Sequence, residues 1–261
     1  NAGTLRNRGS EVSLSGDLVA TKDLLWTLGG NISINDNEIT SLGQVNEFLQ
    51  GTAIIRVGLP IGSHYIPEWA GVDAATGNPL YYNSDKSITT TYDRTSQSVA
   101  EFGSWLPKYN GGFNSSLSYK GIGLDIFFSY AGGNKRFNNE DYFNQVPNFA
   151  TSNQGTAMLR RWRKPGDVTD IQKFGTPRNF SSKDIQDASY LRLRNVNLSY
   201  VLPASVISKI KGISQIRFYI QGQNLYTWTK WTGFDPEDIN NIAQFEYPAA
   251  KTFTFGLNVN F

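Results

Sequence analysis

Hydrophobic and polar residues alternate along several stretches of the chain, most clearly in the final stretch, residues 252–261. One side of an extended strand there would carry five apolar residues: Phe253, Phe255, Leu257, Val259 and Phe261. In a membrane barrel, one face of each strand meets lipid and the other meets a wet lumen. The pattern therefore predicts a last strand whose apolar face contacts lipid. An edge strand of a soluble β-sandwich alternates in the same way, so this stretch alone leaves both interpretations open.

Six earlier stretches repeat the two-sided pattern, and with the last one they predict seven strands. They span residues 11–20, 23–35, 105–119, 122–130, 195–202 and 213–229. Each could supply the roughly 9–11 residues that a tilted strand needs to cross a bilayer. In the first stretch, Leu18 and Ala20 fall on the apolar side. In the fourth, Phe127 interrupts the polar side.

The connections between these stretches favour a barrel over a sandwich. Thr21-Lys22 and Lys120-Gly121 are tight turns, and residues 203–212 form a compact connection in which Pro203 can start one helical turn. The other connections, residues 37–104, 132–187 and 230–250, are long. Short and long connections alternate, which in an up-and-down meander places all short turns at one end, as in outer-membrane barrels. Tyr226, Trp228 and Trp231 would then form an aromatic belt near the long loops.

Composition narrows the class of protein further. Hydrophobic residues make up 39% of the 261 residues, and no apolar run approaches the roughly 20 residues of a membrane-spanning helix. The chain has no cysteine and a single histidine, His64, which excludes thiolate and multi-histidine metal sites within it. A net charge of +2 gives no indication of nucleic-acid binding. We expect an all-β protein with long loops.

Candidate chemistry in the loops is sparse. Asp235, Glu237 and Asp238 are the one carboxylate cluster that suggests a calcium site, although a solvated turn after Asp-Pro explains it equally. His64 has no nucleophile or acid beside it in the sequence, and is interpreted as a loop residue. The basic run at residues 160–164 contains Trp162, which is expected to pack within its loop. We therefore predict no catalytic residues, no cofactor and no enzymatic activity.

Several segments, taken in order, resemble the C-terminal barrel of the SusC/RagA family of TonB-dependent outer-membrane transporters. The motifs are Asn7-Arg8-Gly9-Ser10-Glu11, Gly58-Leu59-Pro60-Ile61-Gly62, Ala70-Gly71-Val72-Asp73, Thr76-Gly77-Asn78-Pro79, Arg161-Trp162-Arg163-Lys164-Pro165-Gly166-Asp167-Val168-Thr169-Asp170-Ile171, Ala188-Ser189-Tyr190-Leu191-Arg192-Leu193-Arg194-Asn195, Gly222-Gln223-Asn224-Leu225, Gly233-Phe234-Asp235-Pro236-Glu237, Tyr247-Pro248 and the final strand. The resemblance covers the whole chain, residues 1–261. Each motif is weak alone, and their order and spacing make the set specific.

The resemblance implies a 22-stranded barrel in a bacterial outer membrane, of which these would be the last seven strands. It also implies a plug and a TonB-contacting segment, both expected outside this chain, and a SusD-like surface lipoprotein that closes over the external mouth. The cargo would be oligosaccharides or peptides. The partners are thus the remainder of the barrel and plug, the lipoprotein, TonB and outer-membrane lipid.

Ligand contacts are expected from residues that face the lumen and from aromatic residues in the loops. Arg217, Gln221 and Gln223 face inward by parity, and Trp69, Tyr81 and Tyr82 are the loop candidates. The sequence does not discriminate between sugar and peptide. Two other interpretations stay open: a secreted or surface β-sandwich that binds glycans, and a siderophore-type TonB-dependent receptor, which lacks a lid partner.

Overall fold

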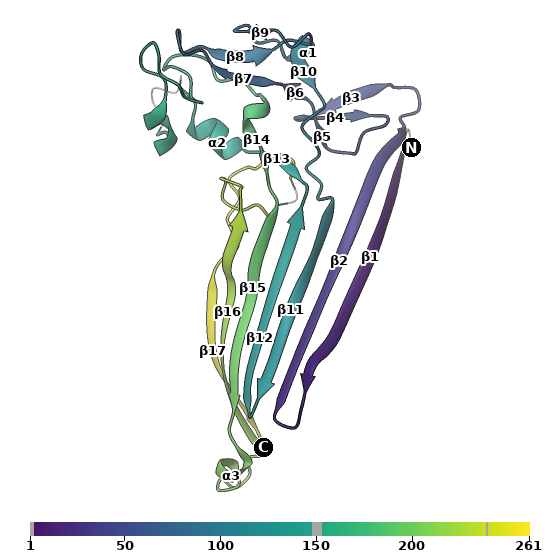
Figure 1. The fold of residues 1–261 in the computed structure, drawn as a ribbon, viewed down its shortest axis with the longest axis vertical. Helices are drawn as coiled ribbons and strands as arrows, with labels where there is room; N and C mark the ends of the chain where they lie inside the picture. The colour runs from purple at the N-terminus through teal and green to yellow at the C-terminus, as the bar shows by residue number, and fades with distance from the viewer. Residues whose placement is uncertain (1–2, 148–152, 239) are drawn as a thin grey trace.

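The computed structural model describes residues 3–147, 153–238 and 240–261, and its main feature is one antiparallel sheet of seven long strands (Figure 1). The strands are β1 (Thr4–Ala20), β2 (Leu24–Ser41), β11 (Tyr109–Tyr119), β12 (Ile122–Gly132), β15 (Tyr190–Val201), β16 (Gln215–Thr229) and β17 (Thr252–Asn260). Each strand pairs with the next in this order, as in an up-and-down meander. The seven predicted strands and their order are confirmed.

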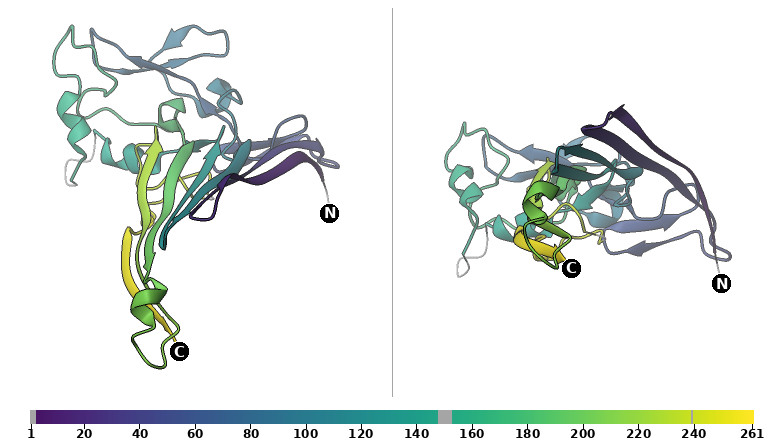
Figure 2. Two further views of the ribbon diagram at one scale, coloured as in Figure 1. Left: turned by 60° about the horizontal axis from the view of Figure 1, so that its bottom comes forward. Right: turned by 90° about the horizontal axis from the view of Figure 1, so that it is seen from below.

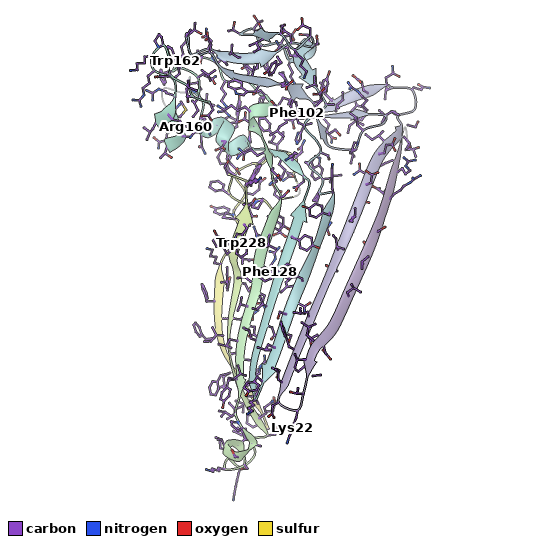
Figure 3. All side chains as sticks on the ribbon, viewed as in Figure 1. Lys22, Phe102, Phe128, Arg160, Trp162 and Trp228 are labelled. Carbon is purple, nitrogen blue, oxygen red and sulfur yellow. The ribbon has the colours of Figure 1, made fainter. Side chains whose placement is uncertain are left out.

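Short and long connections lie at opposite ends of the sheet (Figure 1). Residues 21–23 join β1 to β2, and Lys120 and Gly121 join β11 to β12, both with positive φ, at 47° and 86°. The compact connection before β16 contains one short helix, α3 (Ala204–Ile207), directly after Pro203. All three lie at the end of the sheet where the C-terminus lies, and Lys22 marks that end in Figure 3. The predicted sorting of the connections is therefore confirmed.

Register keeps the apolar residues of neighbouring strands on one face. Ile220 lies opposite both Leu198 and Phe255, while Gln221 lies opposite Asn197 and Thr254 on the other face. A bulge in β1 changes this alternation near the turn, because Val19 pairs with Trp26 while Asp17 pairs with Thr27. Leu18 is the extra residue of the bulge and has no partner. The prediction that Ala20 continues the apolar register of β1 is wrong, since Ala20 pairs with Leu25 and Val19 takes the place opposite Trp26.

The first two strands extend well past their apolar stretch. β2 continues for seven residues beyond Ile34 to Ser41, still paired with β1. Apart from Ile39, which is buried opposite Leu5, the β2 part of this extension is polar and charged, and Arg6 forms an ion pair with Glu38 across it. Backbone pairing sustains the hairpin there, which the sequence pattern did not predict because the apolar alternation ends first.

The two longest connections fold into a packed layer above the sheet (Figure 1). Its elements are β3 (Glu47–Gln50), β4 (Ala53–Arg56), β5 (Ser63–His64), β6 (Ile66–Pro67), β7 (Trp69–Val72), β8 (Pro79–Tyr82), β9 (Ile88–Thr89), α1 (Arg94–Gln97), β10 (Ser98–Val99), β13 (Lys135–Phe137), α2 (Asn139–Asn144), η1 (Thr156–Arg160), η2 (Ser182–Asp184) and β14 (Ile185–Asp187). Its fully buried side chains include Ile54, Tyr81, Phe137 and Ile171. The hydrophobic core of the chain therefore lies among the loops.

No second large sheet faces the seven-stranded one within the described residues, where the other sheets have two or three strands each. The sheet is curved, with β1 and β17 at its two edges (Figure 2). The β-sandwich interpretation is therefore wrong, because a sandwich needs two packed sheets. In the described part of the chain, no helix is long and apolar enough to cross a membrane.

Tight ring-to-backbone packing joins the last two strands. Gly256 lies opposite Tyr219, and a β-carbon at Gly256 would come within 2.1 Å of the Tyr219 ring.

Gly256→Ala is expected to destabilise the β16–β17 pairing by about 1–3 kcal/mol, because the ring must leave its position. Urea titration of the folded protein in detergent measures this. Gly16→Ala in β1 is the matched control, since a β-carbon at Gly16 would meet no other atom within 4 Å. An equal loss in both variants would contradict the packing argument.

Candidate functional site

The polar face of the sheet carries the three residues predicted to face inward. Arg217 lies opposite Val201 and Asn258, near the short-turn end. Gln221 and Gln223 lie higher on the same face, and the Gln221 amide donates a 2.7 Å hydrogen bond to Asn195 Oδ1. The three residues lie on one face of the sheet, as predicted. Their contact with a ligand stays a prediction.

Two arginines of β15 bind the loop between β16 and β17, residues 230–251, which we call the last loop. Arg192 is 3% exposed, donates to Glu237 Oε2 at 2.7 Å and to Thr227 Oγ1 at 2.9 Å, and also pairs with Asp235. Arg194 reaches the same Glu237 carboxylate at 2.6 Å. A planar guanidinium with several donors suits such shared carboxylate contacts. The last loop is thereby held against the polar face of the sheet.

A third arginine binds the far side of the last loop. Arg136 in β13 has no exposed side-chain area, forms an ion pair with Asp238, and donates 2.8 Å and 3.1 Å hydrogen bonds to the carbonyls of Asn240 and Asp235. Its guanidinium also lies 4.9 Å from the centre of the Trp231 ring. Trp231 is 5% exposed, so the prediction that it joins an aromatic belt is wrong, whereas Tyr226 and Trp228 are exposed on the sheet.

These pairs account for the carboxylate cluster that suggested calcium. Asp235, Glu237 and Asp238 each meet an arginine, so three positive charges balance three negative ones. Burial raises the pKa of Asp235. The Ala249 N–H, which donates to the carboxylate, and the Arg192 guanidinium lower this pKa by more, so it lies below the usual value. Among residues 3–147, 153–238 and 240–261, no group of three or more metal-ligating side chains is placed to hold an ion. The calcium interpretation is therefore wrong for this cluster, which holds the loop instead.

Beneath the last loop, the polar face is hollowed into a cavity of about 580 Å³, which we call the lumenal cavity. β2, β11, β12 and β15 form its wall, and Pro236, Glu237 and Asp238 of the last loop cover part of it. Its lining includes Trp105, Asn110, Phe127, Asn134 and Tyr190. The sequence did not identify this site, although Phe127 gave a signal as the apolar residue that interrupts a polar face.

The three aromatic residues predicted as loop contacts have different environments. Tyr81 has no exposed area and packs edge-to-face on Trp69 at 5.6 Å and on Tyr92 at 5.2 Å. The prediction that Tyr81 contacts ligand is therefore wrong, because its ring lies within the core of the loops. Trp69 is half-buried, and the Lys183 ammonium lies 5.2 Å from its ring centre. Tyr82 is half-buried, so Trp69 and Tyr82 stay candidates.

The basic run at residues 160–164 lies in the loop layer, away from the seven-stranded sheet, as the labelled Arg160 and Trp162 show (Figure 3). Arg160 pairs with Asp170 at 2.8 Å, and Arg163 donates to the Leu159 carbonyl at 2.9 Å. The Trp162 indole donates to the Ala74 carbonyl at 3.0 Å and its ring packs over Gly77. Trp162 packs within the loops, as expected, and the arginines contact the loop itself.

His64 is buried in the loop layer between two partners. Its Nε2 lies 2.7 Å from the Lys135 carbonyl, which can only accept, so Nε2 carries the proton. Its Nδ1 lies 3.1 Å from Thr52 Oγ1, which donates to it. This neutral, buried ring joins β5 to β13, and its role is structural.

Acid is expected to loosen the loop layer through His64. Burial lowers the pKa of His64 below its ordinary value of 6.5. The unfolded state therefore binds the proton more readily, so this stabilising contribution is complete above pH 6.5 and is lost as the pH falls towards the folded pKa. Each unit of pKa difference corresponds to about 1.4 kcal/mol. Trypsin cleavage rates of the loops between about pH 8 and pH 5 measure the effect, and His64→Gln should flatten the profile. An unchanged profile in that variant would contradict this origin.

The geometry defines a class of protein before any comparison. A curved meander with one apolar face, one polar face and all long loops at one end is part of the wall of a transmembrane β-barrel.

No protein-family model matches the chain. TonB-dependent receptor P3 of Formosa agariphila is 30% identical over an alignment 300 positions long, which covers 100% of this chain and 29% of that receptor. TonB-dependent receptor SusC of Bacteroides thetaiotaomicron is 27% identical, with 100% of this chain and 27% of that receptor covered.

Solved structures agree with these relatives. The structure of the RagAB peptide transporter superposes with a TM-score of 0.91 at 32% identity, over 99% of this chain and 30% of that one. The RagAB peptide importer in its "open-open" state gives 0.91 at 33% identity, over 99% and 29%. The chain thus belongs to the SusC/RagA family of TonB-dependent transporters. It spans about three tenths of the length of the relatives that it matches.

Proposed function

We propose that this chain forms part of the barrel of a TonB-dependent importer in a bacterial outer membrane. The observation that carries the proposal is the two-faced meander with its sorted connections, combined with the likeness to TonB-dependent receptors along the whole chain. The apolar face, including Phe253, Phe255, Leu257, Val259 and Phe261, meets lipid. The polar face lines the lumen, and the loop layer lies outside the cell. The plug and the TonB-contacting segment belong to the remainder of the protein.

The proposed cargo is an oligosaccharide or a peptide, and the proposed partner is a SusD-like lipoprotein that covers the loop layer. The partner proposal is supported by the likeness to SusC and to the barrel chain of RagAB. A siderophore-type receptor would share the barrel but lack that lid. The proposal includes transport and no catalytic step.

Affinity purification of the full-length protein from detergent-solubilised outer membranes tests this function. We expect the protein in the outer-membrane fraction, together with a SusD-like lipoprotein in stoichiometric amount. Recovery in the soluble fraction would contradict the membrane barrel. Recovery from the outer membrane without a lipoprotein would favour the siderophore-type alternative.

A further inference from the structure

We propose that the lumenal cavity is a contact site for a neutral saccharide, a cargo class that its lining favours over charged sugars and peptides. The inference rests on the proposed import function and names the cargo of that same lumen. The cavity has a volume of about 580 Å³, within the size range of small-ligand sites. Three properties of its lining carry the argument: its charge, its aromatic surface and the pairing of its strands.

The lining residues that the structure describes carry no unpaired charge. Glu237 and Asp238 are the two charged residues among its described lining residues, and both are paired with arginines. A uronate, a sulfated sugar or a peptide terminus would need an unpaired opposite charge to offset its own desolvation. Breaking one of these pairs to provide it would leave a buried charge uncompensated. The cavity therefore suits a ligand without net charge.

Aromatic surface and hydrogen-bonding groups alternate around the cavity. Trp105, Phe127 and Tyr190 provide ring surface, and Phe127 remains 39% exposed although it lies on the polar face of β12. Asn110 is exposed on the polar face and lines the cavity, and its side-chain amide can both donate and accept hydrogen bonds. A sugar ring combines an apolar C–H face with hydroxyl groups that donate and accept, which matches both features.

A peptide would lack its usual mode of recognition here. Extended peptides commonly bind by adding a strand to an open sheet edge. The wall strands β2, β11, β12 and β15 each have a paired strand on both sides. Their main-chain N–H and C=O groups are therefore hydrogen-bonded within the sheet and cannot pair with a peptide. A peptide in this cavity would have to rely on side-chain contacts alone.

Two pairs of variants in the full-length protein, kept in its native outer membrane, test the contact site. Phe127→Ala and Asn110→Ala alter the lining, and Tyr219→Ala and Asn258→Ala are their matched controls. The Phe127 ring lies over Gly112, and the Tyr219 ring lies over Gly256 in the same way. Both alanine variants therefore uncover a glycine on the polar face. Of the two aromatic residues, only Phe127 lines the cavity. Asn110 and Asn258 are both exposed on the polar face, and only Asn110 lines the cavity.

The probes are three ladders of defined oligomers offered together to the cells: neutral oligosaccharides from glucan, mannan, galactan and xylan, oligomers of polygalacturonate, and tryptic peptides of casein. Mass spectrometry measures the disappearance of each oligomer from the medium relative to cells that lack the protein. We expect neutral oligosaccharides to be taken up. In Phe127→Ala and Asn110→Ala, the concentration for half-maximal uptake should rise about tenfold, with the controls unchanged.

The outcomes separate this inference from the function on which it rests. Uptake of only peptides or only polygalacturonate oligomers would overturn the neutral-saccharide assignment while leaving the importer intact. Neutral uptake with equal effects in variants and controls would overturn the cavity as the contact site. No uptake of any ladder by the unaltered protein would contradict the proposed import function itself.

Discussion

Replacement of Arg192 by methionine is expected to release the last loop from the polar face of the sheet. Arg192 joins β15 to both Asp235 and Glu237 and is itself almost fully buried. Removing one partner of a buried ion pair typically costs about 3–5 kcal/mol, because the other charges stay behind uncompensated. A cost of about 3 kcal/mol would shift the balance between docked and undocked loop more than about 100-fold.

Trypsin cleavage after Lys230 and Lys251, the exposed lysines at the two ends of the last loop, measures this release in outer-membrane vesicles. We expect cleavage to be much faster in Arg192→Met than in the unaltered protein. Arg217→Met is the matched control, because Arg217 lies on the same face near the short-turn end, away from the loop. Adding Asp235→Asn and Glu237→Gln to Arg192→Met should restore part of the protection. Unchanged cleavage in Arg192→Met would refute the role of this arginine in holding the loop.

Tyr81→Ala is expected to destabilise the loop layer by about 3–5 kcal/mol, the usual cost of removing a buried aromatic ring. The ring has no exposed area and contacts both Trp69 and Tyr92. Tyr81→Phe should be nearly neutral, because the hydroxyl has only a long 3.4 Å contact from Asn179 Nδ2. Pulse proteolysis in urea, which cleaves only opened molecules, gives the change in stability.

Tyr82→Ala is the matched control, since the neighbouring ring is half-buried and its loss should cost about 1 kcal/mol or less. The comparison also separates packing from ligand contact for the two residues. If Tyr81→Phe kept full stability but weakened cargo uptake, Tyr81 would have to touch the ligand after all, against its burial.

The sequence alone determined the strands, their two faces and the sorting of the connections. This was possible because a strand in a barrel has a side-chain period of two, and each of its faces meets a uniform environment. Ile216, Phe218 and Ile220 could therefore be assigned to one face without knowing their neighbours. The same rule failed at Ala20, because the bulge at Leu18 inverts the alternation after it, and beyond Ile34, where pairing continues after the strict apolar alternation ends.

Only the tertiary structure decided what the loop residues do, because their partners are far away in sequence. Asp235 and Glu237 looked like metal ligands until Arg192 and Arg194, more than 40 residues earlier, were seen to bind them. Tyr81 looked like an exposed loop aromatic until the packing of the loop layer buried it. Long loops carry no periodic pattern, so their burial and ion pairing depend on contacts that no local stretch of sequence specifies. For the same reason, the lumenal cavity became visible only when the last loop was placed over the polar face.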